Sequence, residues 1–300
     1  MNTPSASEHH SGNKISALWR LLRPYQWSKN LLVFIPLFMA HRWQDVAAAV
    51  ALLKVFVAFS LASSAIYVIN DALDVDSDRQ HPVKRQRPFA SGDLPISLAP
   101  WLAPALILAA ALMTQSLPLA AQWTVAAYVV LALLYCLVLK PLLWLDVIAL
   151  AALYTLRVLA GAAAIAVIVS PWLAGFSMFM FFGLAAVKRY SELRATGAVS
   201  LSGRGYTAGD ALPVITLGSG ASLLSVLVLA LYLNSDDVHQ LYRQPQWLWL
   251  IGPTLLYWQA RLWTFAHRGQ IQRDPLSFSL RDLNSWAALT LCVLFFRLAL

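Results

Sequence analysis

The chain has 300 residues, of which 59% are hydrophobic and only 12% are charged, far more apolar than a soluble domain. This composition excludes a protein whose main solvent is water. The formal net charge is +8. In so apolar a chain, we assign the basic residues to membrane topology and expect no nucleic-acid partner.

The chain opens with a polar segment, and residues 1–14 are expected to form a disordered cytoplasmic tail because they lack the apolar core of a secretory signal. An amphipathic stretch around Trp19 and Arg20 follows, and its helical spacing predicts a helix in the membrane interface. Residues 15–300 are expected to form one transmembrane domain.

Apolar runs recur along the rest of the chain. A helix needs roughly 20 residues to cross a hydrocarbon core of ~30 Å. The runs therefore predict an all-α polytopic membrane protein with about nine transmembrane helices. The predicted spans are 28–41, 46–70, 96–114, 120–139, 143–168, 171–189, 212–233, 247–266 and 283–299.

Most of the 22 lysines and arginines fall on one side of these spans, together with the amino terminus. The positive-inside rule places that side in the cytoplasm. The longer connections on this side, 71–95, 190–211 and 267–282, hold most of the polar chemistry. The working face is therefore predicted to be cytoplasmic.

Four of the 14 acidic residues, Asp71, Asp74, Asp76 and Asp78, crowd at the end of the second span. On an α-helix, Asn70, Asp74 and Asp78 share one face, and Asp71 lies beside it. Like charges this close raise one another's pKa unless a cation neutralises them. Mg²⁺ favours oxygen ligands and bridges one or two carboxylates to substrate phosphates. We predict that Asn70, Asp71, Asp74 and Asp78 hold Mg²⁺ with a diphosphate; the alternative is a solvated acidic loop.

A basic loop with Lys84, Arg85 and Arg87 follows the acidic segment directly. Proteins hold phosphate with metal ions and cationic side chains. The three residues are therefore predicted to bind substrate. The alternative is that they only mark the cytoplasmic side of the membrane.

Other cations lie at or within the spans. Arg157 is about a dozen residues into an apolar span, where a lipid-facing charge would cost several kcal/mol. It must face the interior, where it binds a substrate phosphate or pairs with a buried carboxylate. Lys29 begins the first span and either reaches a phosphate in the cavity or snorkels to the interface. Lys188 and Arg189 close the sixth span as candidate phosphate ligands, with Glu192 ordering them or contacting a ribose.

These features resemble the UbiA superfamily of membrane prenyltransferases, whose first signature N-D-x-x-D-x-x-x-D matches Asn70, Asp71, Asp74 and Asp78 without a gap. The resemblance covers nearly the whole chain. It implies nine transmembrane helices around a central cavity that opens to the cytoplasm and sideways to lipid.

Members of the superfamily place substrate-binding polar residues near Tyr135, Lys140 and Asp146, although the last two are also ordinary residues for the end of a span. Gly203 and Gly205 predict a flexible loop over the site, but two glycines are weak evidence.

The chain departs from the typical aromatic prenyltransferase of this superfamily, which carries a second Asp-rich motif after its sixth helix. The corresponding stretch is KRYSEL, in which Glu192 is the only acidic residue. This stretch, with RPYQWSKNLLVFIPL, NDALDVDSDRQHPVKRQRPFASGDLP and LYTLRVLAGAAA, resembles the decaprenyl-phosphate phosphoribosyltransferase branch. The resemblance implies Mg²⁺-dependent transfer of 5-phosphoribose from 5-phosphoribosyl 1-diphosphate to a polyprenyl phosphate, with release of pyrophosphate.

The resemblance also implies a location in the bacterial cytoplasmic (inner) membrane. Asp74, Asp78 and Arg157 are then the predicted catalytic residues, and Tyr190 joins the substrate-binding set. A homo-oligomer and a separate phosphatase acting on the product are compatible with this interpretation. Two alternatives stay open, namely a prenyl-diphosphate transferase acting on an aromatic acceptor and a transporter for a phosphorylated lipid.

Overall fold

The structure is a computed structural model that describes residues 14–196, 203–271 and 274–300. The described residues form helices and connections, without a β-strand. The predicted tail lies outside the described residues except for Lys14, which begins helix α1 (Lys14–Leu22).

Six helices are long and apolar enough to cross a membrane, which confirms the predicted all-α polytopic membrane protein. They are α3 (Val46–Leu73), α6 (Ala99–Thr114), α7 (Leu119–Leu134), α8 (Leu145–Ala164), α9 (Pro171–Thr196) and α10 (Ala211–Leu233). Short turns extend three of them, namely the 3₁₀ turns η3 (Ile96–Leu98) and η5 (Ala208–Asp210) and the π-helix η4 (Tyr135–Leu139).

The other three predicted spans coincide with shorter helical segments. These are η1 (Pro24–Phe34) with α2 (Ile35–Met39), η6 (Pro245–Leu250) with α12 (Ile251–His267), and α14 (Leu283–Ala299). Helical structure is thus present at all nine predicted positions, and six of these segments meet the length criterion for a crossing.

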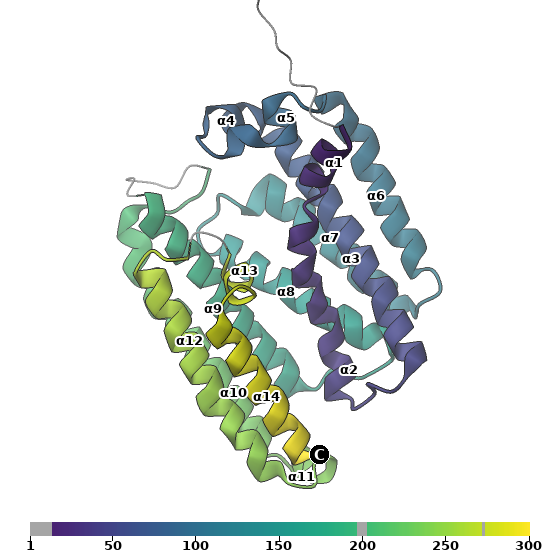
Figure 1. Ribbon diagram of the computed structural model, residues 1–300, viewed down its shortest axis with the longest axis vertical. Helices are drawn as coiled ribbons and strands as arrows, with labels where there is room; N and C mark the ends of the chain where they lie inside the picture. Colours follow the sequence, from purple (N-terminus) through teal and green to yellow (C-terminus); the bar gives the residue numbers. More distant parts are fainter. Residues whose placement is uncertain (1–13, 197–202, 272–273) are drawn as a thin grey trace, which may run out of the picture.

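The helices form two groups with α8 between them (Figure 1). One group contains α3, α6 and α7, and the other contains α9, α10, α12 and α14; α8 packs on both α7 and α9. The short helices α4 (Val75–Gln80) and α5 (Pro88–Ser91) lie at one end of the bundle with α1. Helix α11 (Asp236–Leu241) and the carboxyl terminus lie at the other.

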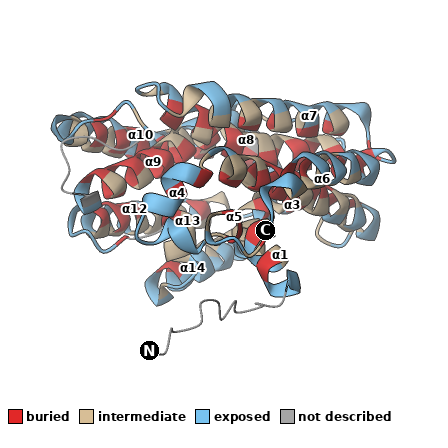
Figure 2. Cartoon of the chain, turned by 90° about the horizontal axis from the view of Figure 1, so that it is seen from above, coloured by how far each residue is buried: buried red, intermediate tan, exposed pale blue. Residues whose placement is uncertain are grey.

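Helix α8 is the centre of the bundle. In its most apolar stretch 61% of the residues are buried within the protein, against 17% for α6 and for α7, and Figure 2 shows the same contrast in colour. Since α6 and α7 leave most of their apolar side chains exposed, their outer faces suit lipid rather than water. Polar groups on α8 therefore face protein.

A glycine on α8 allows the amino-terminal segment to reach this centre. A Cβ at Gly161 would lie 2.0 Å from the carbonyl oxygen of Val33, so only glycine permits the approach of η1 to α8. This contact places Lys29 and Asn30, both on η1, beside the middle of the bundle.

The end of α7 winds as a π-helix, a rare conformation that is frequent at functional sites. The amide of Lys140 donates to the carbonyl of Tyr135 at 3.0 Å, five residues earlier. The added residue in this turn changes the direction of the side chains that follow, so the local geometry decides where Tyr135 and Lys140 point.

Candidate active site

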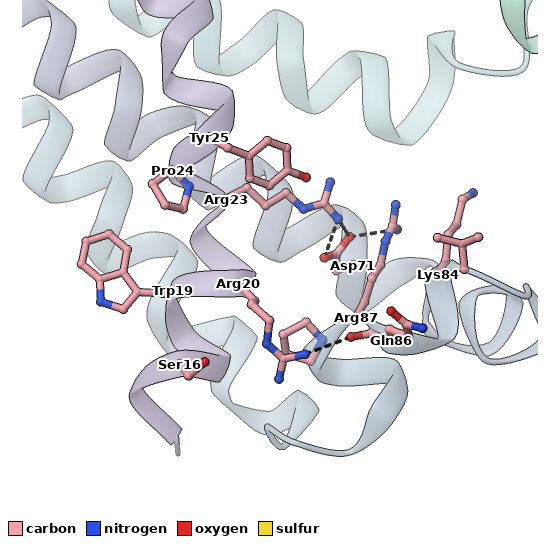
Figure 3. A pocket seen from close by; sticks show the side chains of 12 residues that line it. Ser16, Trp19, Arg20, Arg23, Pro24, Tyr25, Asp71, Lys84, Gln86 and Arg87 are labelled. Carbon is pink, nitrogen blue, oxygen red and sulfur yellow. Dashed lines mark hydrogen bonds and ion pairs between the residues drawn. The ribbon is translucent and has the colours of Figure 1, made fainter. Parts of the chain in front are cut away.

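Two carboxylates are buried together at the α4–α5 end of the bundle. Asp71 and Asp78 are each only 1% exposed. Arg87 joins them, because its Nη1 donates to Asp71 Oδ1 at 3.0 Å and to Asp78 Oδ2 at 2.7 Å. Arg23 donates to both oxygens of Asp71, at 2.6 and 2.7 Å (Figure 3). Two arginines therefore compensate the buried charge.

Asp74 occupies a different environment. Its side chain is 27% exposed and accepts a hydrogen bond from Lys140 Nζ at 2.8 Å. Helix α3 ends here, and the backbone of Asp74 leaves the helical region at φ −89°, ψ 5°. We refer to Asp71, Asp74 and Asp78 together as the acidic cluster.

The predicted arrangement of the acidic cluster needs a correction. The expected face was Asn70, Asp74 and Asp78, whereas the structure pairs Asp71 with Asp78 and turns Asp74 to Lys140. Asp71 lies on α3 and Asp78 on α4, so the end of α3 at Asp74 breaks the single helical face that the sequence predicted. Among the described residues, Arg23 and Arg87 lie against Asp71 and Asp78, and Lys140 lies against Asp74.

The donors that remain fit a divalent ion that is shared with substrate. Asp78 Oδ1 is buried and has no hydrogen-bond partner among the described residues, and Asp74 is reachable. In the described part of the chain, no three His, Cys, Asp or Glu side chains converge as a complete metal site. Mg²⁺ commonly takes one or two carboxylates plus water and phosphate oxygens, so its assignment to Asn70, Asp71, Asp74 and Asp78 stays a prediction.

A second charged group lies where α8 begins and α9 ends, and we call Asp146, Arg189, Glu192, Arg204 and Tyr206 the arginine cluster. Asp146 and Arg189 have fully buried side chains, and Arg189 Nη2 lies 2.5 Å from Asp146 Oδ2. Arg189 also donates to Glu192. Tyr206 donates to Asp146 Oδ1 at 2.7 Å, and Arg204 Nε lies 3.4 Å from Glu192 Oε2. Each carboxylate of this cluster has an internal cation.

This arrangement separates three adjacent residues that the sequence grouped as substrate ligands. Arg189 is fully buried between Asp146 and Glu192, and its predicted role as a phosphate ligand stays a prediction. Tyr190 turns toward α12, where its hydroxyl lies 2.8 Å from His267 Nδ1. Lys188 is half-buried and has no hydrogen bond or ion pair with the described residues. Successive residues point 100° apart on a helix, so all three cannot face one cavity.

The π-helix links the two clusters. The hydroxyl of Tyr135 accepts a hydrogen bond from Arg204 Nη1 at 2.9 Å, while Lys140 contacts Asp74. Two predicted substrate-binding residues thus bridge the acidic and the arginine clusters.

The basic loop contributes unequally to this space. Lys84 lies within electrostatic range of Asp74, Asp78 and Glu192, so it stands between the two clusters. Arg85 is exposed and has no ion pair within the described residues. The structure therefore brings Lys84 and Arg87 to the site and leaves Arg85 outside it.

Arg157 lies deeper along α8, 6% exposed. Its Nε donates to Asn30 Oδ1 at 2.8 Å, its Nη2 to the Tyr128 hydroxyl at 3.1 Å, and its Nη1 to the carbonyl of Leu153 at 2.5 Å. Neutral oxygens and aromatic rings surround it, and it forms no ion pair with a described residue. A buried carboxylate partner, one of the two predicted alternatives, is thus absent among these residues.

Lys29 forms an ion pair with Asp274, whose carboxylate lies 3.2 Å from its Nζ. Asp274 also caps α13 (Pro275–Ser279) by accepting from the amide of Ser277. Burial acts to raise the pKa of Asp274, but Lys29 and the hydrogen bonds from Ser277 outweigh it and lower that pKa. This ion pair holds the connection between α12 and α13 against Lys29.

Sequence reasoning did not single out Arg23, Asp274 or Tyr206 as site residues, and gave Arg204 no role. The glycine at position 205 was the one sequence feature that pointed to the connection around Arg204 and Tyr206. In the structure, a Cβ at Gly205 would lie 2.4 Å from the carbonyl oxygen of Pro141. The glycine allows Arg204 and Tyr206 to reach the start of α8. Arg23 has a left-handed backbone (φ 53°) that no local pattern predicts.

The chain is a polytopic membrane protein whose charged side chains gather in the acidic cluster and the arginine cluster. The UbiA prenyltransferase family matches residues 31–295, and the chain belongs to this family, which confirms the resemblance. A UbiA homologue from Archaeoglobus fulgidus bound to DMAPP and Mg²⁺ has a similar fold, with a TM-score of 0.70, 15% identity, and coverage of 94% of this chain and 96% of that one.

Three relatives are more similar in sequence. An uncharacterized protein of Sinorhizobium fredii is 36% identical over 88% of this chain, which spans only 52% of that longer protein. Nodulation protein NoeC of Azorhizobium caulinodans is 34% identical over 88% of this chain and 86% of its own length. Decaprenyl-phosphate phosphoribosyltransferase of Mycolicibacterium smegmatis is 38% identical over 71% of this chain and 69% of its own length.

Proposed function

We propose that this protein transfers 5-phosphoribose from 5-phosphoribosyl 1-diphosphate to a polyprenyl phosphate in the bacterial cytoplasmic membrane, with its site facing the cytoplasm. The observation that carries the proposal is the asymmetry of the two clusters. In the acidic cluster, Asp74 is 27% exposed and Asp78 Oδ1 has neither a hydrogen bond nor an ion pair among the described residues. In the arginine cluster, Asp146 is fully buried against Arg189, and the 34% exposed Glu192 lies against Arg189 and Arg204. A site for two phosphorylated substrates needs one metal-binding side and a surplus of cations, and this arrangement matches that need.

The residues divide between the two substrates by position. Asp74 and Asp78, with Asn70 and Asp71, hold the metal and the diphosphate of the donor. A bound Mg²⁺ supplies neutralisation of the pyrophosphate leaving group. Lys84 and Arg87 bind its phosphate oxygens from the basic loop.

The remaining cations suit the other phosphates. Lys140 contacts Asp74, and Lys188 lies within electrostatic range of Glu192 and Asp274. Lys29 and Arg157 lie deeper in the bundle. Arg157 has no carboxylate partner among the described residues, so an incoming phosphate is its natural counter-ion. Tyr135 positions Arg204, and Glu192 positions Arg189 and Arg204. The carboxylate of Glu192 can also accept hydrogen bonds from ribose hydroxyls.

The reaction needs no protein nucleophile. A lipid phosphate is ionised at neutral pH, so its oxygen attacks C1 of the ribose while the C1–O bond to pyrophosphate breaks. The protein contributes alignment of the two substrates and electrostatic stabilisation of the departing charge. The relatives named decaprenyl-phosphate phosphoribosyltransferase support this assignment at 34–38% identity.

The second candidate is a prenyl-diphosphate transferase acting on an aromatic acceptor. The family membership and the solved homologue bound to DMAPP and Mg²⁺ favour it. The compensated arginine cluster stands against it, because no second set of available carboxylates faces the acidic cluster among the described residues. A lipid transporter is the third candidate.

The test uses the purified full chain in lipid nanodiscs with radiolabelled 5-phosphoribosyl 1-diphosphate, a polyprenyl phosphate and Mg²⁺. We expect pyrophosphate release and a labelled lipid only when both substrates are present, and none after chelation of the metal. Turnover of a prenyl diphosphate with an aromatic acid would establish the second candidate instead. Lipid movement across vesicles without turnover would establish the transporter.

A further inference from the structure

A cavity lies beside the acidic cluster, between α1 and the basic loop (Figure 3). Its volume is about 580 Å³, within the range of small-molecule sites. We call it the α1 pocket. The residues that matter for its chemistry are Trp19, Arg20, Tyr25, Lys84, Arg87 and Asp71.

The wall of the α1 pocket is strongly cationic. Arg20, Arg23, Lys84 and Arg87 line it, against the single carboxylate of Asp71. Arg23 and Arg87 bond Asp71 through one terminal nitrogen each, which leaves their other N–H groups for a ligand. Lys84 has no ion pair within the described residues. The charge of the wall selects an anion.

Arg20 is placed to exchange its partner. Its Nη2 lies 2.5 Å from Asp93 Oδ2, and its Nη1 donates to the carbonyl of Gln86 at 3.3 Å. Both side chains of the ion pair are partly exposed, and ion pairs in such positions contribute little stability. An incoming phosphate can therefore replace Asp93 as the counter-ion of Arg20.

The rim of the α1 pocket is apolar and faces outward. Trp19 is 50% exposed and Tyr25 is 58% exposed, and Leu31 continues this exposed surface along η1. Tryptophan and tyrosine in such positions are typical of the membrane interface, and α1 has the amphipathic character of an interfacial helix. A ligand of this pocket therefore has a charged head and apolar chains.

We propose that the α1 pocket binds the phosphate headgroup of an anionic phospholipid, with its acyl chains along the exposed surface beside Trp19 and Leu31. This site adjoins that of the proposed transfer reaction, because Asp71, Lys84 and Arg87 border both, whereas Trp19, Arg20 and Tyr25 belong to the α1 pocket alone. A phosphodiester carries one negative charge and several acceptor oxygens, which match Arg20, Lys84 and the free N–H groups of Arg23 and Arg87. Bound lipid would hold α1 and the basic loop together.

The test is native mass spectrometry of the intact protein in detergent, titrated with dioleoyl phosphatidylglycerol and, separately, with dioleoyl phosphatidylcholine. We expect one phosphatidylglycerol to bind about tenfold more tightly than phosphatidylcholine, and Arg20→Gln to remove most of that preference. Arg20→Lys keeps the charge and should restore part of it. Thermal unfolding checks that each variant is folded.

Two control variants separate lipid binding from local structure. Asp93→Asn breaks the same ion pair as Arg20→Gln but leaves the cation, so it should keep or strengthen the preference for phosphatidylglycerol. Arg79→Gln removes a cation outside the pocket that pairs with Asp76, and should change nothing. An equal loss in Asp93→Asn and Arg20→Gln would mean that Arg20 acts only through its ion pair, which overturns the proposal.

Two competition experiments identify the source of the phosphate. Inorganic phosphate at millimolar concentration should not displace phosphatidylglycerol; displacement would show a site for free phosphate. A polyprenyl phosphate should displace it no better than another singly anionic lipid does. Displacement at much lower concentration would assign the pocket to the acceptor lipid and overturn the phospholipid assignment, whether or not the protein catalyses phosphoribosyl transfer.

Discussion

The acidic cluster and the arginine cluster contain the same kinds of side chain but differ in how completely their charges are compensated. In the arginine cluster, Asp146 and Arg189 are both inaccessible and form an ion pair with each other, and Tyr206 donates to Asp146, although Arg189 Nε has no hydrogen-bond partner among the described residues. In the acidic cluster, Asp74 is reachable and Asp78 keeps a buried oxygen without a partner among the described residues. Buried carboxylates therefore serve two purposes here, and the unsatisfied ones indicate where a ligand binds.

The strongest way to break this comparison is to neutralise the reachable carboxylate. We expect Asp74→Asn to reduce phosphoribosyl transfer by about 100-fold or more, because a metal-bound diphosphate loses a charged ligand. The melting temperature should change little. Asp76→Asn is the matched control, since Asp76 is exposed and Arg79 is its one ion-pair partner within the described residues, and its turnover should equal that of the wild type. Near-normal activity of Asp74→Asn would contradict the metal assignment.

The arginine cluster should respond in the opposite way. Asp146→Asn leaves the fully buried Arg189 without its main counter-ion, which costs about 3–5 kcal/mol of stability. Thermal unfolding in detergent should show a large decrease in melting temperature. The double variant Asp146→Leu with Arg189→Met removes both charges and should recover much of the loss. An unchanged melting temperature in Asp146→Asn would show that this cluster does not stabilise the fold.

A smaller effect is expected from the connection that completes the arginine cluster. Gly205→Ala places a methyl group against the carbonyl of Pro141, which costs about 1–3 kcal/mol and draws Arg204 and Tyr206 away from α8. Gly220→Ala, where the added carbon meets nothing within 4 Å, is the matched control and should be neutral or stabilising. Equal melting temperatures for the two variants would argue against the close contact.

The smallest expected effect is a pH dependence of donor binding, which tests the role of Lys84. Its pKa is lowered, first by partial desolvation and then by repulsion from Arg87 and Lys140, which Asp74 and Asp78 only partly offset. Its ammonium group therefore loses its proton at a lower pH than an ordinary lysine, and its attraction for phosphate disappears as the pH rises through that pKa. We expect the KM for the phosphorylated donor to increase about two- to threefold at alkaline pH.

The matched variant for this experiment is Lys84→Arg, whose guanidinium keeps its charge across the same range. Its KM should stay flat while that of the wild type rises. Parallel alkaline profiles for the two proteins would show that another group is responsible.

Much of the fold is predictable from the sequence because membrane spans need long apolar runs, and helical segments occur at all nine predicted positions. The acidic segment is also visible, since four carboxylates at the end of an apolar helix are unusual. The pairing of Asp71 with Asp78 was not predictable in this way, because α3 ends at Leu73 and a new helix begins at Val75, so the two carboxylates do not lie on one helix.

The rest depends on contacts between distant segments. The orientation of Lys188, Arg189 and Tyr190 depends on how α9 rotates against α8 and α12, and the apolar pattern of α9 does not fix that rotation because several of its sides are buried. The position of Lys140 depends on a single π turn. Arg23 reaches Asp71 across 48 residues of sequence, from a backbone conformation that no nearby residue demands.

The 3₁₀ winding of η1 lengthens the segment that coincides with the shortest predicted span. This winding rises about 2.0 Å per residue against 1.5 Å for an α-helix, so residues 24–39 extend over roughly 30 Å, whereas the same residues in an α-helix would extend over only about 24 Å. The hydrocarbon layer is ~30 Å thick. A 3₁₀-helix is also narrower than an α-helix. The segment packs closely on α8 at Gly161, which has no side chain. A segment of few residues thereby places Lys29 and Asn30 in the interior of the bundle without a full-length transmembrane helix.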